Sequence, residues 1–243
     1  MGEVMIYADS RGRGLKMNEV PVVVMPGKGL REIQARIMAD CEQKESKPRM
    51  IYVMAGVIDV VHKTNKGEVI FVGNVGGVVS EVEQKLVSIM TGVKGSTLVF
   101  CTIAPMDIRR WNVLRRNQGR IKELRYERSY KEMQVEINEA VRELNRRITA
   151  INRVRAWKTP FLHSEVLHNK KNNRVRVEFW HLVDGIHPGG GLLEKWGKMM
   201  RTTVKVNLER LGVREEAMKI GVLPESEEEE EKRFDRAVLE RDN

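Results

Sequence analysis

The chain has 243 residues, of which 41% are hydrophobic and 32% are charged. This length and composition suit one globular α/β domain with extensions. No apolar run approaches the roughly 18 residues that a membrane span needs, and no basic-then-apolar leader opens the chain. We therefore expect a soluble protein of the cytoplasm or nucleus. The two cysteines, Cys41 and Cys101, favour buried free thiols over a disulfide framework.

Charge is unevenly distributed along the chain. The formal net charge is +9, but residues 224–243 hold nine acidic and four basic side chains, which leaves +14 on residues 1–223. Six of the seven residues in 225–231 are glutamate. Such a block repels itself and is typical of a solvated tail. We expect one folded domain over 1–212, followed over 213–243 by a linker and an acidic, disordered tail that folding does not require.

Apolar runs that end in turn residues predict the strands of a sheet. They cover residues 4–8, 20–25, 50–54, 97–103 and a segment within 157–163. Apolar residues at helical spacing lie between them, as at Leu30, Ile33 and Ile37. This alternation predicts an α/β fold, a three-layer sandwich in which helices flank a parallel sheet of five strands.

Two further helices are expected in the second half of the chain. The first runs from Ser129 to about Val154, with Ser129 as N-cap and Glu132 completing a capping box. Residues 168–173 are polar and turn-like, and residues 174–182 suit a strand or an extended loop. Three glycines at 189–191 open a last helix that ends near Gly212.

Three short segments carry the residues of a nucleophilic site. They are residues 8–14 (ADSRGRG), 55–59 (AGVID) and 184–188 (DGIHP), and each follows an apolar run. Small-residue turns after buried strands are where α/β folds place their chemistry. Ser10 is a candidate nucleophile, His187 a candidate base and Asp184 a group that can orient the imidazole. In the alternative interpretation, Ser10 only caps a helix and Asp184 only closes a turn.

The order of these segments resembles the SGNH hydrolase superfamily, the GDSL-type esterases and lipases. Asp9, Ser10 and Gly14 match its first block, Gly27 its second, and Gly56 with Asp59 its third, while residues 184–188 match its last block intact. The Pro-Gly form of the second block and the last block are most similar to SGNH domains of animal retroelement proteins.

The resemblance implies a flavodoxin-like fold and hydrolysis of a small ester through an acyl-Ser10 intermediate. It implies a catalytic triad of Ser10, His187 and Asp184, an oxyanion hole formed by the backbone N–H groups of Ser10 and Gly27, and no cofactor. One position departs from the family. Ile58 stands where the family has an asparagine that donates to the oxyanion, and isoleucine has no side-chain donor.

The departure at Ile58 leaves two hypotheses open. In the first, the chain is an ester hydrolase with a weakened oxyanion hole, unless Asn74 or Lys28 supplies a donor. In the second, it is a non-catalytic SGNH-like domain, of mobile-element origin, that binds nucleic acid or a protein partner. Asp59 is expected to have a structural role, as an acceptor of backbone N–H groups.

A basic segment at 109–128 bears on the second hypothesis, because Trp111 and Tyr126 lie among its arginines. Cations with aromatic neighbours can bind phosphates and stack on bases. The candidate nucleic-acid contacts are Arg109, Arg110, Arg115, Arg116 and Arg120. The simpler interpretation, which we favour, is a solvated helix face or a seat for the acidic tail. The histidines and cysteines have no metal-ligand spacing, so no zinc site is predicted.

Overall fold

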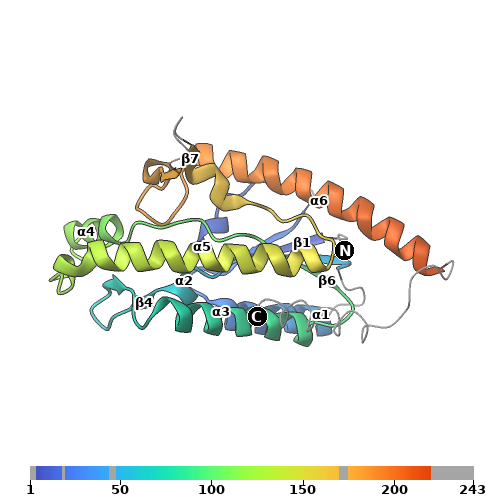
Figure 1. The fold of residues 1–243 in the computed structure, drawn as a ribbon, viewed down its shortest axis with the longest axis horizontal. Helices are drawn as coiled ribbons and strands as arrows, with labels where there is room; N and C mark the ends of the chain where they lie inside the picture. The colour runs from blue at the N-terminus through green and yellow to red at the C-terminus, as the bar shows by residue number, and fades with distance from the viewer. Residues whose placement is uncertain (1–3, 18–19, 44–47, 170–174, 220–243) are drawn as a thin grey trace.

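A four-stranded parallel sheet lies at the centre of the computed structural model, which describes residues 4–17, 20–43, 48–169 and 175–219 (Figure 1). The strands are β1 (Val4–Ala8), β2 (Val22–Val24), β3 (Met50–Met54) and β6 (Thr97–Phe100), in the order β2-β1-β3-β6. Ala8 pairs with Val24 on one side and with Met54 on the other. The carboxyl ends of the strands therefore meet at one edge.

Helices cover both faces of the sheet, as predicted. Every residue of β1 and β3 is buried, which explains their uninterrupted apolar sequences. Helices α1 (Leu30–Gln43), α3 (Val75–Gly92) and α5 (Tyr130–Val154) share one core with Met5 and Tyr7. Helix α6 (Gly190–Lys219) shares the other core with Val4 and Ile6, and it lies across the sheet from α1 and α3 in Figure 1.

Shorter elements complete the fold. They are helices α2 (Val57–Val60) and α4 (Ile108–Asn117), the antiparallel pairs β4 (His62–Lys63) with β5 (Val69–Ile70) and β7 (Leu167–Asn169) with β8 (Val175–Val177), and the 3₁₀ turns η1 (Ser10–Gly12), η2 (Glu127–Ser129), η3 (Leu162–Val166) and η4 (Phe179–His181). Both cysteines are buried free thiols, as predicted. Within the described ranges, no helix is long and apolar enough to cross a bilayer.

The prediction of a fifth strand within 157–163 is wrong. The free edge of β6 is occupied by side chains of α5: the Asn152 amide exchanges two hydrogen bonds with the backbone of Phe100, at 3.1 and 2.7 Å. Asn145 does the same with the backbone of Ile103, at 2.6 and 2.8 Å. Pro160 has no N–H to donate, and its carbonyl accepts the backbone N–H of Thr102 at 3.1 Å. Two asparagine amides thus take the place of a strand.

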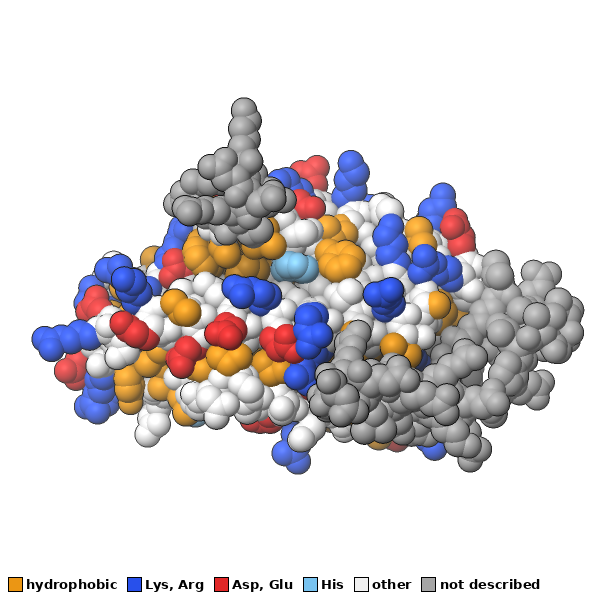
Figure 2. All heavy atoms as spheres, in the orientation of Figure 1, with side chains coloured by type: hydrophobic (Ala, Val, Ile, Leu, Met, Phe, Trp, Pro, Cys, Tyr) orange, Lys and Arg blue, Asp and Glu red, His pale blue; other side chains and the backbone are white. Residues whose placement is uncertain are grey.

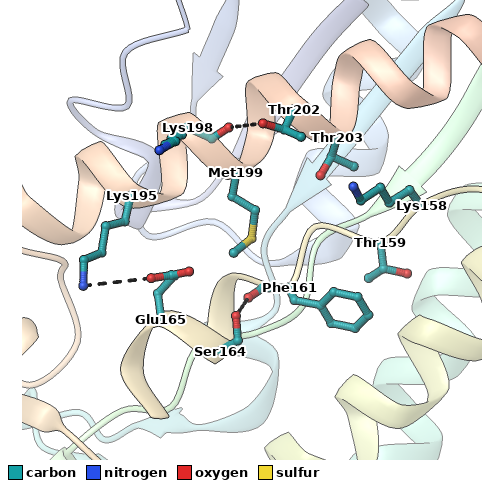
Figure 3. Close-up of a pocket in the computed structure, with 10 residues that line it drawn as sticks. All are labelled: Lys158, Thr159, Phe161, Ser164, Glu165, Lys195, Lys198, Met199, Thr202 and Thr203. Carbon is teal, nitrogen blue, oxygen red and sulfur yellow. Dashed lines mark hydrogen bonds and ion pairs between the residues drawn. The ribbon is translucent and has the colours of Figure 1, made fainter. Parts of the chain in front are cut away.

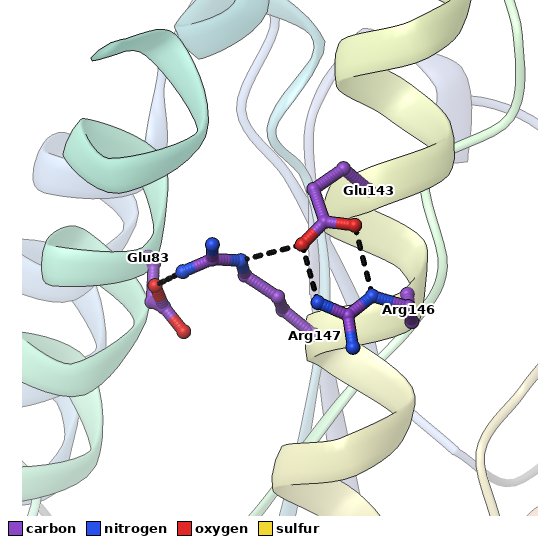
Figure 4. Close-up of polar contacts among 4 residues, drawn as sticks. All are labelled: Glu83, Glu143, Arg146 and Arg147. Atoms are coloured by element: carbon purple, nitrogen blue, oxygen red, sulfur yellow. Dashed lines mark hydrogen bonds and ion pairs between the residues drawn. The ribbon is translucent and has the colours of Figure 1, made fainter. Parts of the chain in front are cut away.

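Ion pairs join helices α3 and α5 (Figure 4). Arg147 binds Glu83 of α3 and, through Nε at 3.0 Å, Glu143 of its own helix. Arg146 binds the other oxygen of Glu143 through Nε at 2.8 Å. The hydrogen bonds from Arg146 and then from Arg147 lower the pKa of Glu143 to about 2, against the opposing effect of partial burial.

Two predicted helix ends differ from the structure. Ser129 makes no side-chain capping bond, because η2 runs directly into α5 and gives Ser129 a turn-like backbone with φ −96° and ψ 0°. Helix α6 continues through Gly212 to Lys219, since one interior glycine costs a helix only about 1 kcal/mol. The expected boundary at 212 therefore falls inside a helix. The acidic run at 225–231 lies outside the described residues.

Candidate active site

Ser10 lies on a tight turn directly after β1, the strand between β2 and β3. The backbone N–H of Asp9 donates to the carbonyl of Met54 at 3.0 Å, and the Asp9 carboxylate accepts the N–H of Arg11 at 2.9 Å. The turn then folds back on the strand so closely that a Cβ at Gly12 would lie 2.4 Å from the Cβ of Ala8. Gly12 is therefore required for this turn, which leaves Ser10 half-buried.

His187 and Asp184 reach the same point from the loop between η4 and α6. His187 Nε2 lies 2.9 Å from Ser10 Oγ, and His187 Nδ1 lies 2.7 Å from Asp184 Oδ2. The other carboxylate oxygen accepts the backbone N–H groups of Ile186 at 3.0 Å and His187 at 2.8 Å. Ser10 and the Asp184–His187 pair, in which His187 lies 177 positions after Ser10 along the sequence, thus form one hydrogen-bonded chain of three side chains.

The electrostatics of Asp184 suit a carboxylate beside an imidazole. Partial burial alone would raise its pKa, but the side-chain hydrogen bond with His187 and the two backbone N–H groups outweigh this effect and lower the pKa below its usual value. The carboxylate therefore stays ionised at neutral pH and holds the proton of the ring on Nδ1.

Helix α4 and its N-cap contact the Asp184–His187 loop. These contacts were not predicted from the sequence. The backbone N–H of Asp107 donates to the carbonyl of Gly185 at 2.7 Å. Gly185 has a φ of +92°, and a Cβ there would lie 2.4 Å from the carbonyl oxygen of Asp107, so only glycine fits. The Trp111 ring packs against the His187 ring with centroids 5.4 Å apart. The one signal in the sequence was Asp107, a residue type that favours N-caps, placed four positions before Trp111.

Comparison with known proteins identifies the fold that carries these residues. No family model and no curated protein matches the sequence. Among solved structures, a GDSL-like lipase from Bacteroides thetaiotaomicron aligns with a TM-score of 0.52 and 15% identity, covering 86% of this chain and 88% of that one. A lipase/acylhydrolase from Enterococcus faecalis aligns with a TM-score of 0.54 and 14% identity, covering 85% and 97%. The chain has the SGNH-hydrolase fold.

The remaining SGNH motif residues lie in the loops after neighbouring strands. Gly27 follows β2 with a φ of +72°, and Gly56 follows β3 with a φ of +116°. Both therefore flank the Ser10 turn at the carboxyl edge of the sheet. Gly14 also has a positive φ, of +84°, and lies against the Leu193 side chain of α6. These glycines adopt backbone conformations that side chains disfavour.

In the segment that matches the third SGNH block, Asp59 makes structural contacts and Ile58 is exposed at the surface. Asp59 accepts the backbone N–H of Leu30, at the start of α1, at 2.9 Å, and binds Lys85 Nζ at 3.0 Å. The side chain of Ile58 is 42% exposed and offers no donor. Asn74, considered as a substitute donor, caps helix α3 by accepting the N–H of Gly77 at 2.8 Å.

The structure separates the arginines of the basic segment into two groups. Arg110 donates to backbone carbonyls of the loop before Asp184, and the Arg115 guanidinium lies 4.0 Å from the centroid of the Trp111 ring. Arg116 lies 3.7 Å from the Glu127 carboxylate. Arg109 and Arg120 are exposed. In the described residues, no group of three or more His, Cys, Asp or Glu side chains is placed to hold a metal ion.

Proposed function

We propose that this protein hydrolyses ester bonds through an acyl-Ser10 intermediate. The observation that supports the proposal most strongly is the continuous hydrogen-bonded chain from Ser10 Oγ through His187 to Asp184. A serine hydroxyl becomes an effective nucleophile only when a base takes its proton in the transition state. The SGNH-type fold, shared with lipases and acylhydrolases, is consistent with this chemistry.

In the proposed mechanism, Ser10 Oγ attacks the ester carbonyl carbon while His187 Nε2 takes the hydroxyl proton. The tetrahedral intermediate then collapses, the C–O bond to the alcohol breaks, and the leaving oxygen receives that proton from Nε2. Water attacks the acyl-serine in a second round that uses the same base. Asp184 keeps the ring proton on Nδ1 and stabilises the imidazolium in both rounds.

The oxyanion hole of this proposal is weaker than that of the family. The backbone N–H groups of Ser10 and Gly27 serve as donors, and Ile58 contributes none. Loss of one donor typically costs about 10²–10³ in rate, so slow but measurable turnover is expected.

Fluorophosphonate labelling tests the proposal without knowledge of the natural substrate. We expect the wild-type protein to gain the mass of one phosphonyl group, mapped by peptide mass spectrometry to Ser10, and Ser10→Ala to gain none. His187→Ala should label far more slowly, because Ser10 would lose its base. A folded wild-type protein that neither labels nor turns over an aryl ester would instead support the non-catalytic binding domain, which the missing donor at Ile58 favours.

A further inference from the structure

A long groove lies between α6 and the segment that follows α5, and none of the triad residues lines it (Figure 3). It consists of two adjoining cavities of about 550 and 400 Å³ that share Lys158, Thr159 and Phe161. The first cavity extends toward Lys195 and Glu165, and the second extends toward Arg153 and the end of α5.

One face of α6 forms a continuous wall of this groove. Its lining residues recur every three or four positions: Lys195, Lys198, Met199, Thr202, Thr203, Val206 and Arg210. With a rise of about 1.5 Å per residue, the stretch from Lys195 to Arg210 is about 22 Å long. This length suits an extended chain better than a compact small molecule.

Cations lie on both walls. Lys195, Lys198 and Arg210 come from α6, while Arg153 and Lys158 lie opposite. The only carboxylate among the lining residues is Glu165, which lies 4.0 Å from Lys195. Within the described part of the chain, Arg153, Lys158 and Lys198 have no carboxylate partner.

The surface view agrees with this distribution of charge. Figure 2 shows Lys and Arg side chains gathered where α6 and the segment after α5 lie in Figure 1. The groove is therefore an electropositive track with little internal neutralisation. Such a track attracts a polyanion, and the attraction is sensitive to salt.

An aromatic side chain lines the groove together with these cations. Phe161 lines both cavities and is 39% exposed. Its segment is held firmly: the Asn207 amide exchanges hydrogen bonds of 2.7 and 2.9 Å with the Lys158 backbone, and the Pro160 carbonyl accepts the N–H and the hydroxyl of Thr102. A fixed, exposed aromatic ring among cations is a stacking platform for a base.

We propose that this groove binds single-stranded nucleic acid, with the cations contacting phosphates and Phe161 stacking on a base. The Phe161 ring meets the His163 ring only edge-on, with centroids 6.0 Å apart, so its face is left for a ligand. An acidic peptide would satisfy the cations but would offer that face no planar partner. The proposal concerns a second site and does not depend on ester hydrolysis. It also differs from the arginine contacts considered in the basic segment at 109–128.

Fluorescence anisotropy with a labelled single-stranded oligothymidylate tests the proposal on the full chain at low salt. Phe161→Leu removes the ring and keeps an apolar side chain, and it should weaken binding about 5-fold or more. Phe161→Leu should leave the binding of inorganic polyphosphate and polyglutamate unchanged. Lys158→Gln and Lys198→Gln should weaken the binding of all three ligands. Each should also reduce the slope of log affinity against log salt concentration for the oligonucleotide by about 0.7. Fluorophosphonate labelling of Ser10 should be the same in all variants.

Arg109→Gln and Arg120→Gln are the matched controls, because both remove an exposed cation of the basic segment at 109–128. We expect them to change oligonucleotide affinity less than Lys158→Gln does. The proposal is overturned if the wild type does not bind, if these control variants are the ones that lose affinity, or if Phe161→Leu binds normally. If Phe161→Leu binds normally while the lysine variants lose affinity for all three ligands, the groove is a general anion site suited to an acidic peptide.

Discussion

Arg110 of helix α4 donates a hydrogen bond of 3.1 Å to the backbone carbonyl of Val183, the residue that precedes Asp184. A second guanidinium nitrogen reaches the carbonyl of Phe179 at 3.3 Å. One arginine thus joins both ends of the peptide that leads into the Asp184–His187 loop. Because the imidazole must stay aligned with Ser10 Oγ, Arg110 is a positioning residue in the proposed hydrolase.

Arg110→Gln should therefore lower kcat by roughly 10-fold or more, because small displacements of a catalytic group are costly. KM for a small aryl ester should change little, since Arg110 does not touch the substrate in this mechanism. Arg110→Lys should recover part of the loss. The control is Arg109→Gln, which removes the same charge from the adjacent exposed position and should retain wild-type kcat. Equal losses in the two variants would point to net charge instead of loop position.

Asn145 is expected to be as important for stability as a buried hydrophobic residue. Replacing it with alanine leaves the N–H and the carbonyl of Ile103 without partners at the free edge of β6. Each unsatisfied buried group costs about 1–3 kcal/mol, so Asn145→Ala should lose about 2–5 kcal/mol in the free energy of unfolding, measured by urea denaturation. Asn117→Ala, at an exposed position at the end of α4, should be nearly neutral.

The pH dependence of stability should contain a contribution from Glu143. Its pKa is about 2 in the folded protein, below the ordinary value of 4.5 for a glutamate, so its ionised form stabilises the fold above pH 4.5. This stability is lost as the pH falls from 4.5 toward 2. Glu143→Gln should lose about 1 kcal/mol at pH 7, because the carboxylate is partly exposed.

The test for Glu143 is urea denaturation of both proteins at several pH values. The difference between wild type and Glu143→Gln should be constant from pH 7 to about 5.5 and should then shrink steadily toward pH 3. Glu123→Gln is a matched control, since this carboxylate is exposed and lies 3.6 Å from Arg125. A Glu143 difference that stays constant down to pH 3 would contradict the assigned pKa.

The sheet and the edge where Ser10 lies were predictable from sequence because the signals are local. Strands β1 and β3 are buried on both faces and read as apolar runs, and turn residues follow each of them immediately. That residues 157–163, which the structure describes, form no strand of the sheet was not predictable. It depends on Asn145 and Asn152, which lie more than 40 positions from the backbone groups that they bind. The sequence around these two asparagines gives no sign that their side chains are buried and not exposed to solvent.

The contacts between α4 and the Asp184–His187 loop could not be predicted for a similar reason. An arginine-rich helix with a tryptophan is typical of a solvated or nucleic-acid-binding face, and sequence alone gave Arg110 and Arg115 no separate roles. In the fold, Arg110 binds a loop 69 and 73 positions away, and Arg115 stacks on the tryptophan that contacts His187. Contacts of this kind depend on tertiary packing, which composition and periodicity do not record.

The side chain at position 58 offers the sharpest test of the proposed chemistry. Ile58 lies in α2 with 42% of its surface exposed, while the neighbouring Asp59 holds the start of α1 and Lys85. Ile58→Asn therefore introduces a donor without opening a core cavity or disturbing Asp59. The free energy of unfolding should stay within about 0.5 kcal/mol of wild type, as is usual for surface substitutions.

We expect Ile58→Asn to raise kcat for a short-acyl aryl ester about tenfold, below the full 10²–10³ because the surroundings of residue 58 suit an apolar side chain. Ile58→Leu, which offers no donor, should keep the wild-type rate, and Ser10→Ala should abolish turnover in either background. A wild-type protein that is already fast and slows on Ile58→Asn would show that another group completes the oxyanion hole. If wild type and Ile58→Asn are equally inert, and neither labels with a fluorophosphonate, the result would establish the non-catalytic domain.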